Sequence, residues 1–195
     1  MAQVLLQALL PRITLLGVLL TFVFIRWRHR RAEDDREATR DARERWLTRI
    51  VVVSWLVPSW LWIGTPFAGF ADLSIHWGIR LVGAAIAVSG LVLLWHVHTT
   101  LGRNFSPWLE LRDEHTLVES GPYARIRHPM YTAGFILALS FGLISGNVLM
   151  ATVPLLGLVP LVAVRIPDEE QMMLDRFGDA YKDYCGRTGR LLPRW

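Results

Sequence analysis

The sequence predicts an all-α, polytopic integral membrane protein with about five transmembrane helices. Of the 195 residues, 52% are hydrophobic and nine are tryptophan. Several stretches contain no charged residue and are long enough for one bilayer crossing, which takes ~20 apolar residues in a helix. Basic residues gather in alternate connections between these stretches, as they do in the cytoplasmic loops of membrane proteins.

The first predicted span covers residues 4–25 and has Pro11 and Arg12 near its middle. A charge at the bilayer centre costs ~3 kcal/mol. Either the helix begins late and Arg12 reaches the interface, or Arg12 faces other helices. A cleaved signal peptide is the alternative for this segment. It is disfavoured because the first eleven residues lack a basic region and no small-residue cleavage site precedes Arg26.

The remaining spans follow from three uncharged stretches. Residues 50–71 and 81–102 are stretches of 22 residues, and each is predicted to cross the bilayer once. Residues 129–164 form a stretch of 36 residues with a polar, glycine-containing break at Ser145-Gly146-Asn147. Because a glycine flanked by polar residues favours a turn, this stretch is predicted to form two short spans joined by a tight turn.

We interpret residues 1–195 as a single membrane domain with two parts. The first part, 1–102, holds three spans and the charged loop 26–49, in which nine arginines face six acidic residues. The second part, 103–195, holds the transmembrane hairpin 129–164.

The distribution of basic residues predicts the orientation. Arginines occupy the first and third connections and the tail, whereas the second connection, taken as residues 65–76, and the Ser-Gly-Asn turn have no lysine or arginine. The positive-inside rule then places the N-terminus outside and the C-terminus in the cytoplasm. Both long polar segments, 103–128 and 165–195, are predicted to share the cytoplasmic side.

Several classes of function are disfavoured by the composition. The single Cys185 excludes an intramolecular disulfide, and no Cys/His spacing resembles a zinc site, so no metal is expected. His96 and His98 lie two residues apart and share no helix face, so we interpret them as interhelical hydrogen-bonding residues. The arginines of 26–49 alternate with acids, which favours the bilayer surface over nucleic acid as their partner.

The tail segment "VRIPDEEQMMLDRFGDAYKDY" is predicted to form an amphipathic helix, with Pro167 in its first turn. Arg165 and Glu169 are four residues apart and share one face if the helix is continuous. The same row continues with Met173, Phe177 and Tyr181. A purely structural interpretation explains the same spacing. In it, Arg165 snorkels to the membrane interface, Glu169 forms an ion pair with it, and the apolar row packs against other helices.

The segment "GPYARIRHPMYTAGF" combines a turn with a helix start. Gly121-Pro122 is a turn signal, and His128-Pro129 marks the beginning of the fourth span, since proline is tolerated in a first helical turn. A helix N-terminus attracts anionic groups. Tyr123 and Tyr131 can stack on a planar ring or donate a hydroxyl hydrogen bond. Each residue also has a structural explanation when considered alone: tyrosine is common at the membrane interface, and His128 can cap the helix.

Together, the motifs "HTLV", "SGPY", "RHPMY", "RIPDEE" and "FGDAYKDY" stand in an order that resembles the isoprenylcysteine carboxyl methyltransferase family of integral membrane enzymes. The likeness covers about the last hundred residues. The first hundred are similar to the family only in hydropathy.

The resemblance implies transfer of the methyl group of S-adenosylmethionine to the carboxylate of a lipidated cysteine. This short chain is a minimal version of the fold, and we expect it to act as a monomer. The resemblance also implies a cytoplasmic cofactor-binding loop followed by the amphipathic tail helix. The residues it implies for cofactor binding are His115, Thr116, Leu117, Val118, Tyr123, His128, Pro129, Met130, Tyr131 and Glu169. Glu110 is our choice for a further polar cofactor contact, and Arg165 is the implied catalytic residue that binds the acceptor.

The chemistry agrees with Arg165 in this role. A sulfonium methyl donor is already activated, and a carboxylate is ionised at neutral pH, so the reaction needs alignment more than a general base. The planar fork of arginine suits a carboxylate better than lysine does.

Alternative functions remain at this stage. A phospholipid N-methyltransferase or a small-thiol S-methyltransferase would methylate a neutral nucleophile with little use for Arg165. A nicotinamide-dependent lipid reductase has a similar tail pattern. A non-catalytic membrane subunit that recruits a partner through its basic loop is the alternative outside enzymes.

Overall fold

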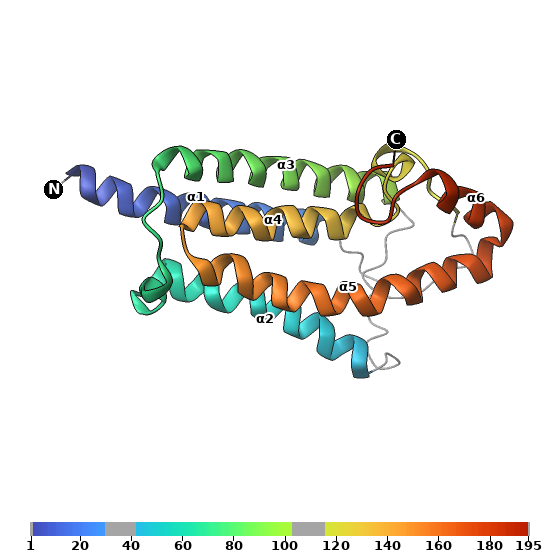
Figure 1. Ribbon diagram of the computed structural model, residues 1–195, viewed down its shortest axis with the longest axis horizontal. Coiled ribbons are helices and arrows are strands. Elements are labelled where there is room, and N and C mark those ends of the chain that lie inside the picture. Colours follow the sequence, from blue (N-terminus) through green and yellow to red (C-terminus); the bar gives the residue numbers. More distant parts are fainter. Residues whose placement is uncertain (1, 30–41, 103–115, 195) are drawn as a thin grey trace. The chain divides into compact units, whose positions relative to one another are not determined.

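The computed structural model describes residues 2–29, 42–102 and 116–194 (Figure 1). These residues form helices and only isolated β-bridges, which confirms the all-α class. The elements are α1 Ala2–Arg28, α2 Ala42–Gly64, η2 Phe67–Ala71, α3 Trp77–Leu101, η4 Gly121–Ala124, α4 Pro129–Ser145, α5 Val148–Phe177 and α6 Asp179–Arg187.

Four described helices are long and apolar enough to cross a membrane. The candidate spans are Ala8–Arg28, Arg45–Gly64, Trp77–Leu101 and Val148–Phe177. Helix α4 is also apolar but has 17 residues, the short end of the length that crosses a bilayer. The predicted count of five spans therefore stays a prediction.

The second span lies nearer the N-terminus than the uncharged stretch 50–71 indicates. Helix α2 ends at Gly64, and η2 follows after Pro66. Proline disfavours the α conformation in the residue before it, and the Thr65 hydroxyl accepts a hydrogen bond from the Phe67 amide at 3.2 Å. Counting uncharged residues included η2 and left out the charged first turns of α2.

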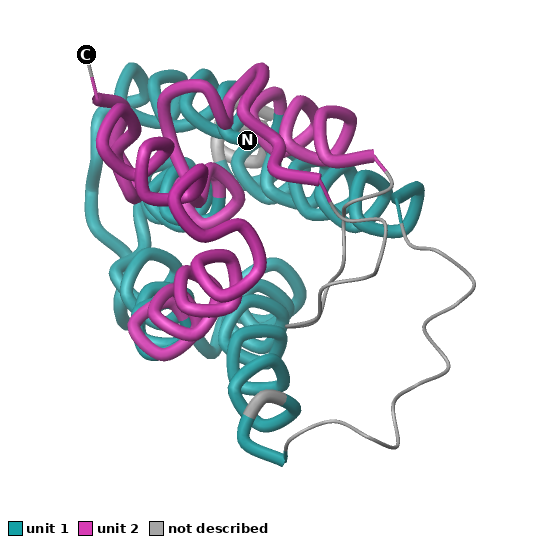
Figure 2. The backbone as a smooth tube through the Cα atoms, turned by 90° about the vertical axis from the view of Figure 1, so that its right-hand side faces the viewer, with its two compact units in different colours: residues 1–91, 134–161 teal, residues 92–133, 162–195 magenta. Residues whose placement is uncertain are grey.

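The described contacts divide the chain into two compact units, coloured in Figure 2. Unit 1 contains residues 1–91 and 134–161, and unit 2 contains residues 92–133 and 162–195. Helices α3, α4 and α5 each contribute residues to both units. The interpretation of 1–195 as one domain stays a prediction, and each unit is described by itself.

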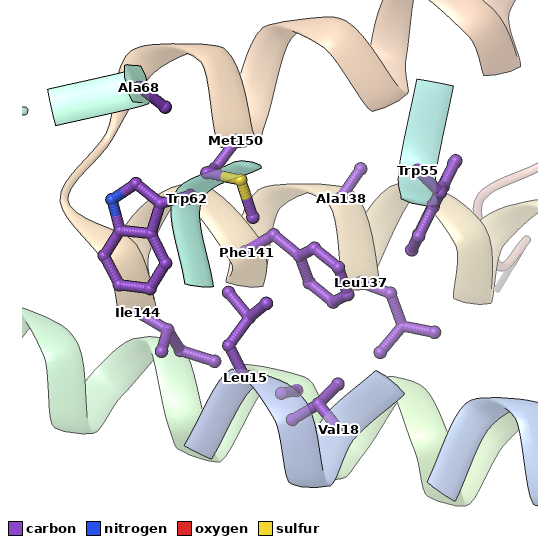
Figure 3. Packing of buried hydrophobic residues seen from close by; sticks show 11 residues of the cluster. Leu15, Val18, Trp55, Trp62, Ala68, Leu137, Ala138, Phe141, Ile144 and Met150 are labelled. Carbon is purple, nitrogen blue, oxygen red and sulfur yellow. The ribbon is translucent and has the colours of Figure 1, made fainter. Parts of the chain in front are cut away.

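The core of unit 1 is an apolar cluster built around Trp55 and Phe141 (Figure 3). Trp55 meets the Phe141 ring edge to face at 5.1 Å and stacks on Phe22 at 5.8 Å between ring centroids. Such aromatic pairs contribute about 1 kcal/mol beyond burial of their area. The other residues of the cluster are Leu15, Val18, Trp62, Ala68, Ala87, Leu137, Ala138, Ile144 and Met150.

Glycines let the helices of unit 1 approach closely. A Cβ atom at Gly157 of α5 would lie 2.1 Å from the Ser54 hydroxyl oxygen of α2. One at Gly142 of α4 would lie 2.5 Å from the Ala151 Cβ of α5. Small residues at helix contacts are typical of membrane helices, whose association depends on van der Waals contact because lipid is as apolar as the helix surface.

The predicted break at Ser145-Gly146-Asn147 lies between α4 and α5. Gly146 has a φ of +67°, which favours glycine. The Asn147 side-chain oxygen accepts the Leu149 and Met150 amides at 3.0 and 3.2 Å and caps α5. Its side-chain nitrogen donates to Asp72 at 2.7 Å. Asn147 thus fixes both the turn and the segment after η2.

Arg12 faces another helix, one of the two alternatives that the sequence leaves open. Its guanidinium lies over the Trp62 ring of α2, 5.7 Å from the ring centroid. A cation over an indole face is stabilised by about 1 kcal/mol or more. Trp62 in turn donates from Nε1 to Asp72 at 2.9 Å.

Candidate functional site

The described polar residues of highest interest all lie in unit 2. The segment 116–128 is a loop that enters η4 at Gly121, where φ is +58° and a Cβ would lie 2.8 Å from the Thr100 hydroxyl. Glycine is required there by conformation and by space. Tyr123 is buried, and its carbonyl accepts the Tyr184 hydroxyl of α6 at 2.8 Å.

The segment predicted as one tail helix is continuous with the span before it and is broken at Gly178. Helix α5 continues without interruption from the apolar span to Phe177, so Pro167 lies in a helix interior and its predicted first-turn position is wrong. A φ of +55° at Gly178 ends α5 before α6 begins. Tyr181 therefore belongs to another helix and does not extend the row from Arg165. It is buried in α6 instead, with its ring 5.9 Å from that of Tyr184.

Helix continuity confirms that Arg165 and Glu169 share one face. The Arg165 Nε lies 3.2 Å from Glu169 Oε1 as an i, i+4 ion pair, and both side chains are mostly buried. Tyr131 of α4 donates its hydroxyl to the same Glu169 oxygen at 2.5 Å. His128, the residue before α4, places Nδ1 3.2 Å from Glu169 Oε2. Glu169 thus joins side chains from two separate segments.

The neighbouring Glu170, which is partly buried, forms a second carboxylate centre. His128 approaches it through the other ring nitrogen, with Nε2 at 3.3 Å from Oε1. Arg127 donates from Nε at 3.1 Å. Arg190, in the tail after α6, donates from Nε at 3.0 Å and from a terminal nitrogen at 2.5 Å.

Backbone hydrogen bonds tie the tail to the start of α4. The amides of Arg127 and His128 donate to the carbonyls of Gly189 and Arg190 at 2.8 and 3.0 Å. Ile126 and Gly189 form a parallel β-bridge. These bonds satisfy amides ahead of the helix and hold His128 at a fixed position.

The charge of His128 follows from its surroundings. Burial lowers the pKa of His128, but its hydrogen bonds to Glu169 and Glu170, together with their negative charges, raise it and prevail. The net pKa lies above the ordinary value near 6.5. Burial also raises the pKa of the Tyr123 hydroxyl, which stays neutral.

The structure brings some of the predicted site residues together and leaves others apart. His128, Tyr131, Arg165 and Glu169 make direct contacts. Pro129 and Met130 are the first residues of α4. Thr116, Leu117 and Val118 lie in the loop before η4, and the contacts described for the cluster do not include them. His115 and Glu110 lie outside the described residues.

Sequence reasoning missed Glu170, Arg127 and Arg190. The acidic triplet "DEE" and the basic tail are visible in the sequence, but the partners stand 43 and 20 residues from Glu170. Nothing in local periodicity pairs residues at such separations. His96 also differs from expectation, because its Nδ1 bonds to the Val92 carbonyl within α3 at 2.9 Å.

Comparison with known proteins finds one matching family. The model of the isoprenylcysteine carboxyl methyltransferase (ICMT) family matches residues 82–175, which include η4, α4 and most of α5. Just under half of the chain is thus similar to this family. The resemblance drawn from the sequence motifs is thereby confirmed.

The ICMT relatives include two plant proteins. A probable protein-S-isoprenylcysteine O-methyltransferase of Oryza sativa subsp. indica is 29% identical over 126 residues, which are 64% of this chain and 66% of that protein. The protein-S-isoprenylcysteine O-methyltransferase B of Arabidopsis thaliana is 30% identical, with 64% of each chain covered. The chain thus spans just under two thirds of the length of these relatives.

A solved ICMT structure shares the fold. The eukaryotic intramembrane Ras methyltransferase ICMT matches 94% of this chain and 67% of its own, with a TM-score of 0.60 and 25% identity. Together with the four apolar helices, this similarity shows that the chain is an integral membrane protein.

Proposed function

We propose that the chain is a membrane methyltransferase that uses S-adenosylmethionine to methylate the carboxylate of an isoprenylated cysteine or a similar lipophilic carboxylate. The match of residues 82–175 to the ICMT family and the names of the similar proteins support the reaction class. The observation that carries the proposal within this chain is the buried cluster of Arg165, Glu169, His128 and Tyr131.

The donor set of this cluster fits S-adenosylmethionine, which carries an ammonium, a carboxylate, a sulfonium and a planar adenine. The Glu169 carboxylate suits an ammonium or offsets a sulfonium charge. His128 supplies a cation for a carboxylate, and the Tyr123 and Tyr131 rings offer flat faces for a planar group. When bound, the cofactor supplies a methyl group that is already activated for transfer.

Arg165 is proposed to hold the acceptor. Its side chain is 13% exposed and is fixed by the ion pair with Glu169, so the arginine lies directly beside the proposed cofactor residues. An ionised carboxylate needs no general base, and a guanidinium can bind it through parallel hydrogen bonds. Fixing the carboxylate at contact distance from a methyl donor removes much of the entropic barrier.

The orientation and assembly are part of the proposal. The basic connections favour an outside N-terminus, with the C-terminus and the cluster on the cytoplasmic side. A lipid-anchored acceptor would arrive from the bilayer and a soluble cofactor from the cytoplasm. We propose that the chain acts as a monomer.

A methyl-transfer assay tests the proposal. Purified protein with radiolabelled S-adenosylmethionine is expected to methylate S-farnesylcysteine analogues that have a free carboxylate and not those with an amidated one. Equal methylation of the amidated compound would contradict carboxyl transfer. Methylation of a phospholipid amine or a small thiol in its place would favour the corresponding alternative enzyme.

Variants of α5 refine that assay. Arg165→Ala is expected to lose transfer while keeping affinity for S-adenosylhomocysteine, whereas Arg176→Ala, an exposed arginine of the same helix, serves as the matched control. If wild-type protein shows neither binding heat nor thermal stabilisation with S-adenosylhomocysteine, the chain is a non-catalytic subunit. Stabilisation by NADPH alone would indicate the reductase.

A further inference from the structure

Glu170 and the tail have no role in the function proposed above, yet they hold one of its central residues. The Glu170 side chain is 15% exposed and accepts hydrogen bonds from Arg127, His128 and Arg190. These donors come from two segments far apart in the sequence. A carboxylate held from several sides keeps one orientation.

His128 lies between two carboxylates, one at each ring nitrogen. Nδ1 lies 3.2 Å from Glu169 and Nε2 lies 3.3 Å from Glu170. A neutral imidazole has one N–H and can donate to only one of them, whereas an imidazolium donates to both. Glu170 therefore fixes the plane of the ring as well as its protonated form.

Arg127 joins Glu170 to the tail. While its Nε donates to Glu170, its NH1 donates to the carbonyls of Thr188 and Cys185 at 2.5 and 3.1 Å. The Thr132 hydroxyl of α4 donates to the Leu191 carbonyl at 2.6 Å. Residues 188–191 consequently contact Arg127, Glu170 and the first turn of α4 at once; we refer to them as the tail clamp.

We propose that Glu170 is a positioning residue of the cofactor site, and that the tail clamp, acting through Arg127 and Arg190, holds Glu170 and His128 in the geometry that binds the cofactor. This inference rests on the proposed function, because it assigns a task to residues around His128. It adds that cofactor affinity depends on tail residues that need not contact the cofactor.

The chain supplies a matched control for the tail arginine. Arg187 pairs with Glu119 at 2.7 Å, and its side chain is 55% exposed, against 58% for Arg190. Both are exposed arginines of the tail with one glutamate partner, but only the partner of Arg190 contacts His128 in the described bonds. Removing either costs similar surface electrostatics, so a difference between them reports the connection to His128.

The first test is calorimetric titration with S-adenosylhomocysteine. Glu170→Gln is expected to weaken affinity about tenfold, the effect of losing a charge-assisted hydrogen bond. Arg190→Ala is expected to weaken it about threefold, with partial recovery in Arg190→Lys, while Arg187→Ala changes it less than twofold. In turnover assays Glu170→Gln should raise KM for S-adenosylmethionine more than it lowers kcat. Equal affinities for Arg190→Ala and Arg187→Ala, or an unchanged affinity in Glu170→Gln, would overturn the proposal.

The second test needs no cofactor and separates failure of this inference from failure of the proposed function. The ring ¹⁵N signals of His128 are followed with pH in wild type, Glu170→Gln and Asp179→Asn. The charged and titratable groups that face His128 directly or through a carboxylate are Glu169, Glu170, Tyr131, Arg127, Arg165 and Arg190.

Glu170→Gln removes one of the two negative neighbours, so the His128 midpoint should fall, whereas the exposed Asp179→Asn should leave it unchanged. If wild-type protein binds no S-adenosylhomocysteine but Glu170→Gln still lowers the His128 midpoint, the proposed function is rejected and the positioning of His128 by Glu170 is kept. Unchanged His128 signals in Glu170→Gln would reject the positioning role. If Glu170→Gln does not fold, the Arg190 and Arg187 variants decide, since both positions are exposed.

Discussion

Unit 1 packs apolar helices through small residues, whereas unit 2 gathers charged side chains around two neighbouring glutamates. In unit 1 the buried cluster consists of aliphatic and aromatic side chains and methionine, and the hydrogen bonds of Asn147 cap a helix. In unit 2 the buried contacts join Arg165, His128 and Arg127 to carboxylates. Burying such charges is unfavourable unless each is paired, which agrees with the functional role proposed for this cluster.

The difference predicts that unit 2 variants change activity and unit 1 variants change stability. In Glu169→Gln, Arg165 and His128 lose their shared negative partner. Losing a charged hydrogen-bond partner of the bound ligand costs about 3 kcal/mol of transition-state binding, so kcat/KM should fall about a hundredfold.

Radiolabelled-methyl transfer measures this effect. The control is Asp175→Asn, which changes a carboxylate that accepts a bond from Gln171 at an exposed site of the same helix. Comparable losses of methyl transfer in the two variants would contradict a specific role for Glu169 in the reaction.

Gly157→Ala should act on stability instead. The added methyl group would meet Ser54 at 2.1 Å, and overpacking of this kind destabilises by about 1–3 kcal/mol. Gly17→Ala in α1 is the control, because nothing lies within 4 Å of its Cβ position. Thermal unfolding in detergent should show a lower midpoint only for Gly157→Ala, with methyl transfer below that midpoint retained. Equal midpoints would remove the evidence for close helix contact at Gly157.

The pH dependence of stability should reveal His128. Because its pKa is raised in the folded protein, its stabilising contribution is complete below the unfolded value near 6.5. The contribution is lost as the pH rises through the higher folded value. The thermal midpoint of wild type relative to His128→Gln should therefore decline between neutral and mildly alkaline pH. A difference that grows with rising pH has the wrong sign and would contradict the imidazolium form.

The smallest effect is expected at the exposed pair of Lys182 and Asp179 in α6. Its atoms lie 2.8 Å apart, but the side chains are 64% and 91% exposed, so water and salt screen the attraction. Lys182→Ala should change neither the thermal midpoint nor methyl transfer measurably. A clear loss of transfer would show that charge matters across the whole of unit 2 rather than at Glu169 and Glu170.

Hydropathy was sufficient to predict the helical class and the break before Asn147, because lipid imposes length and apolarity on each span. It could not predict the end of α2, because Pro66 ends the helix although the residues after it are still apolar. The i, i+4 spacing predicted the pairing of Arg165 with Glu169 once α5 proved continuous. It failed at Tyr181, since Gly178 changes the chain direction.

The pairing of Glu170 with Arg127 and Arg190 could not be predicted, because it depends on where the chain returns after α6. A run of alternating apolar and polar residues specifies which face of a helix is buried, but not which distant loop covers it. The bridge between Ile126 and Gly189 is of the same kind. Local patterns thus predict spans and helix faces, while contacts across long separations require the fold.

The most direct test is a crystal structure of the wild-type protein grown in a lipid phase with S-adenosylhomocysteine. The ligand is expected in unit 2, with polar atoms in hydrogen-bond contact with Glu169 or His128 and with Glu170 still bound to Arg190. Ligand density away from Glu169, His128 and Tyr131, or its absence at saturating concentration, would contradict the assignment of this cluster as the cofactor site.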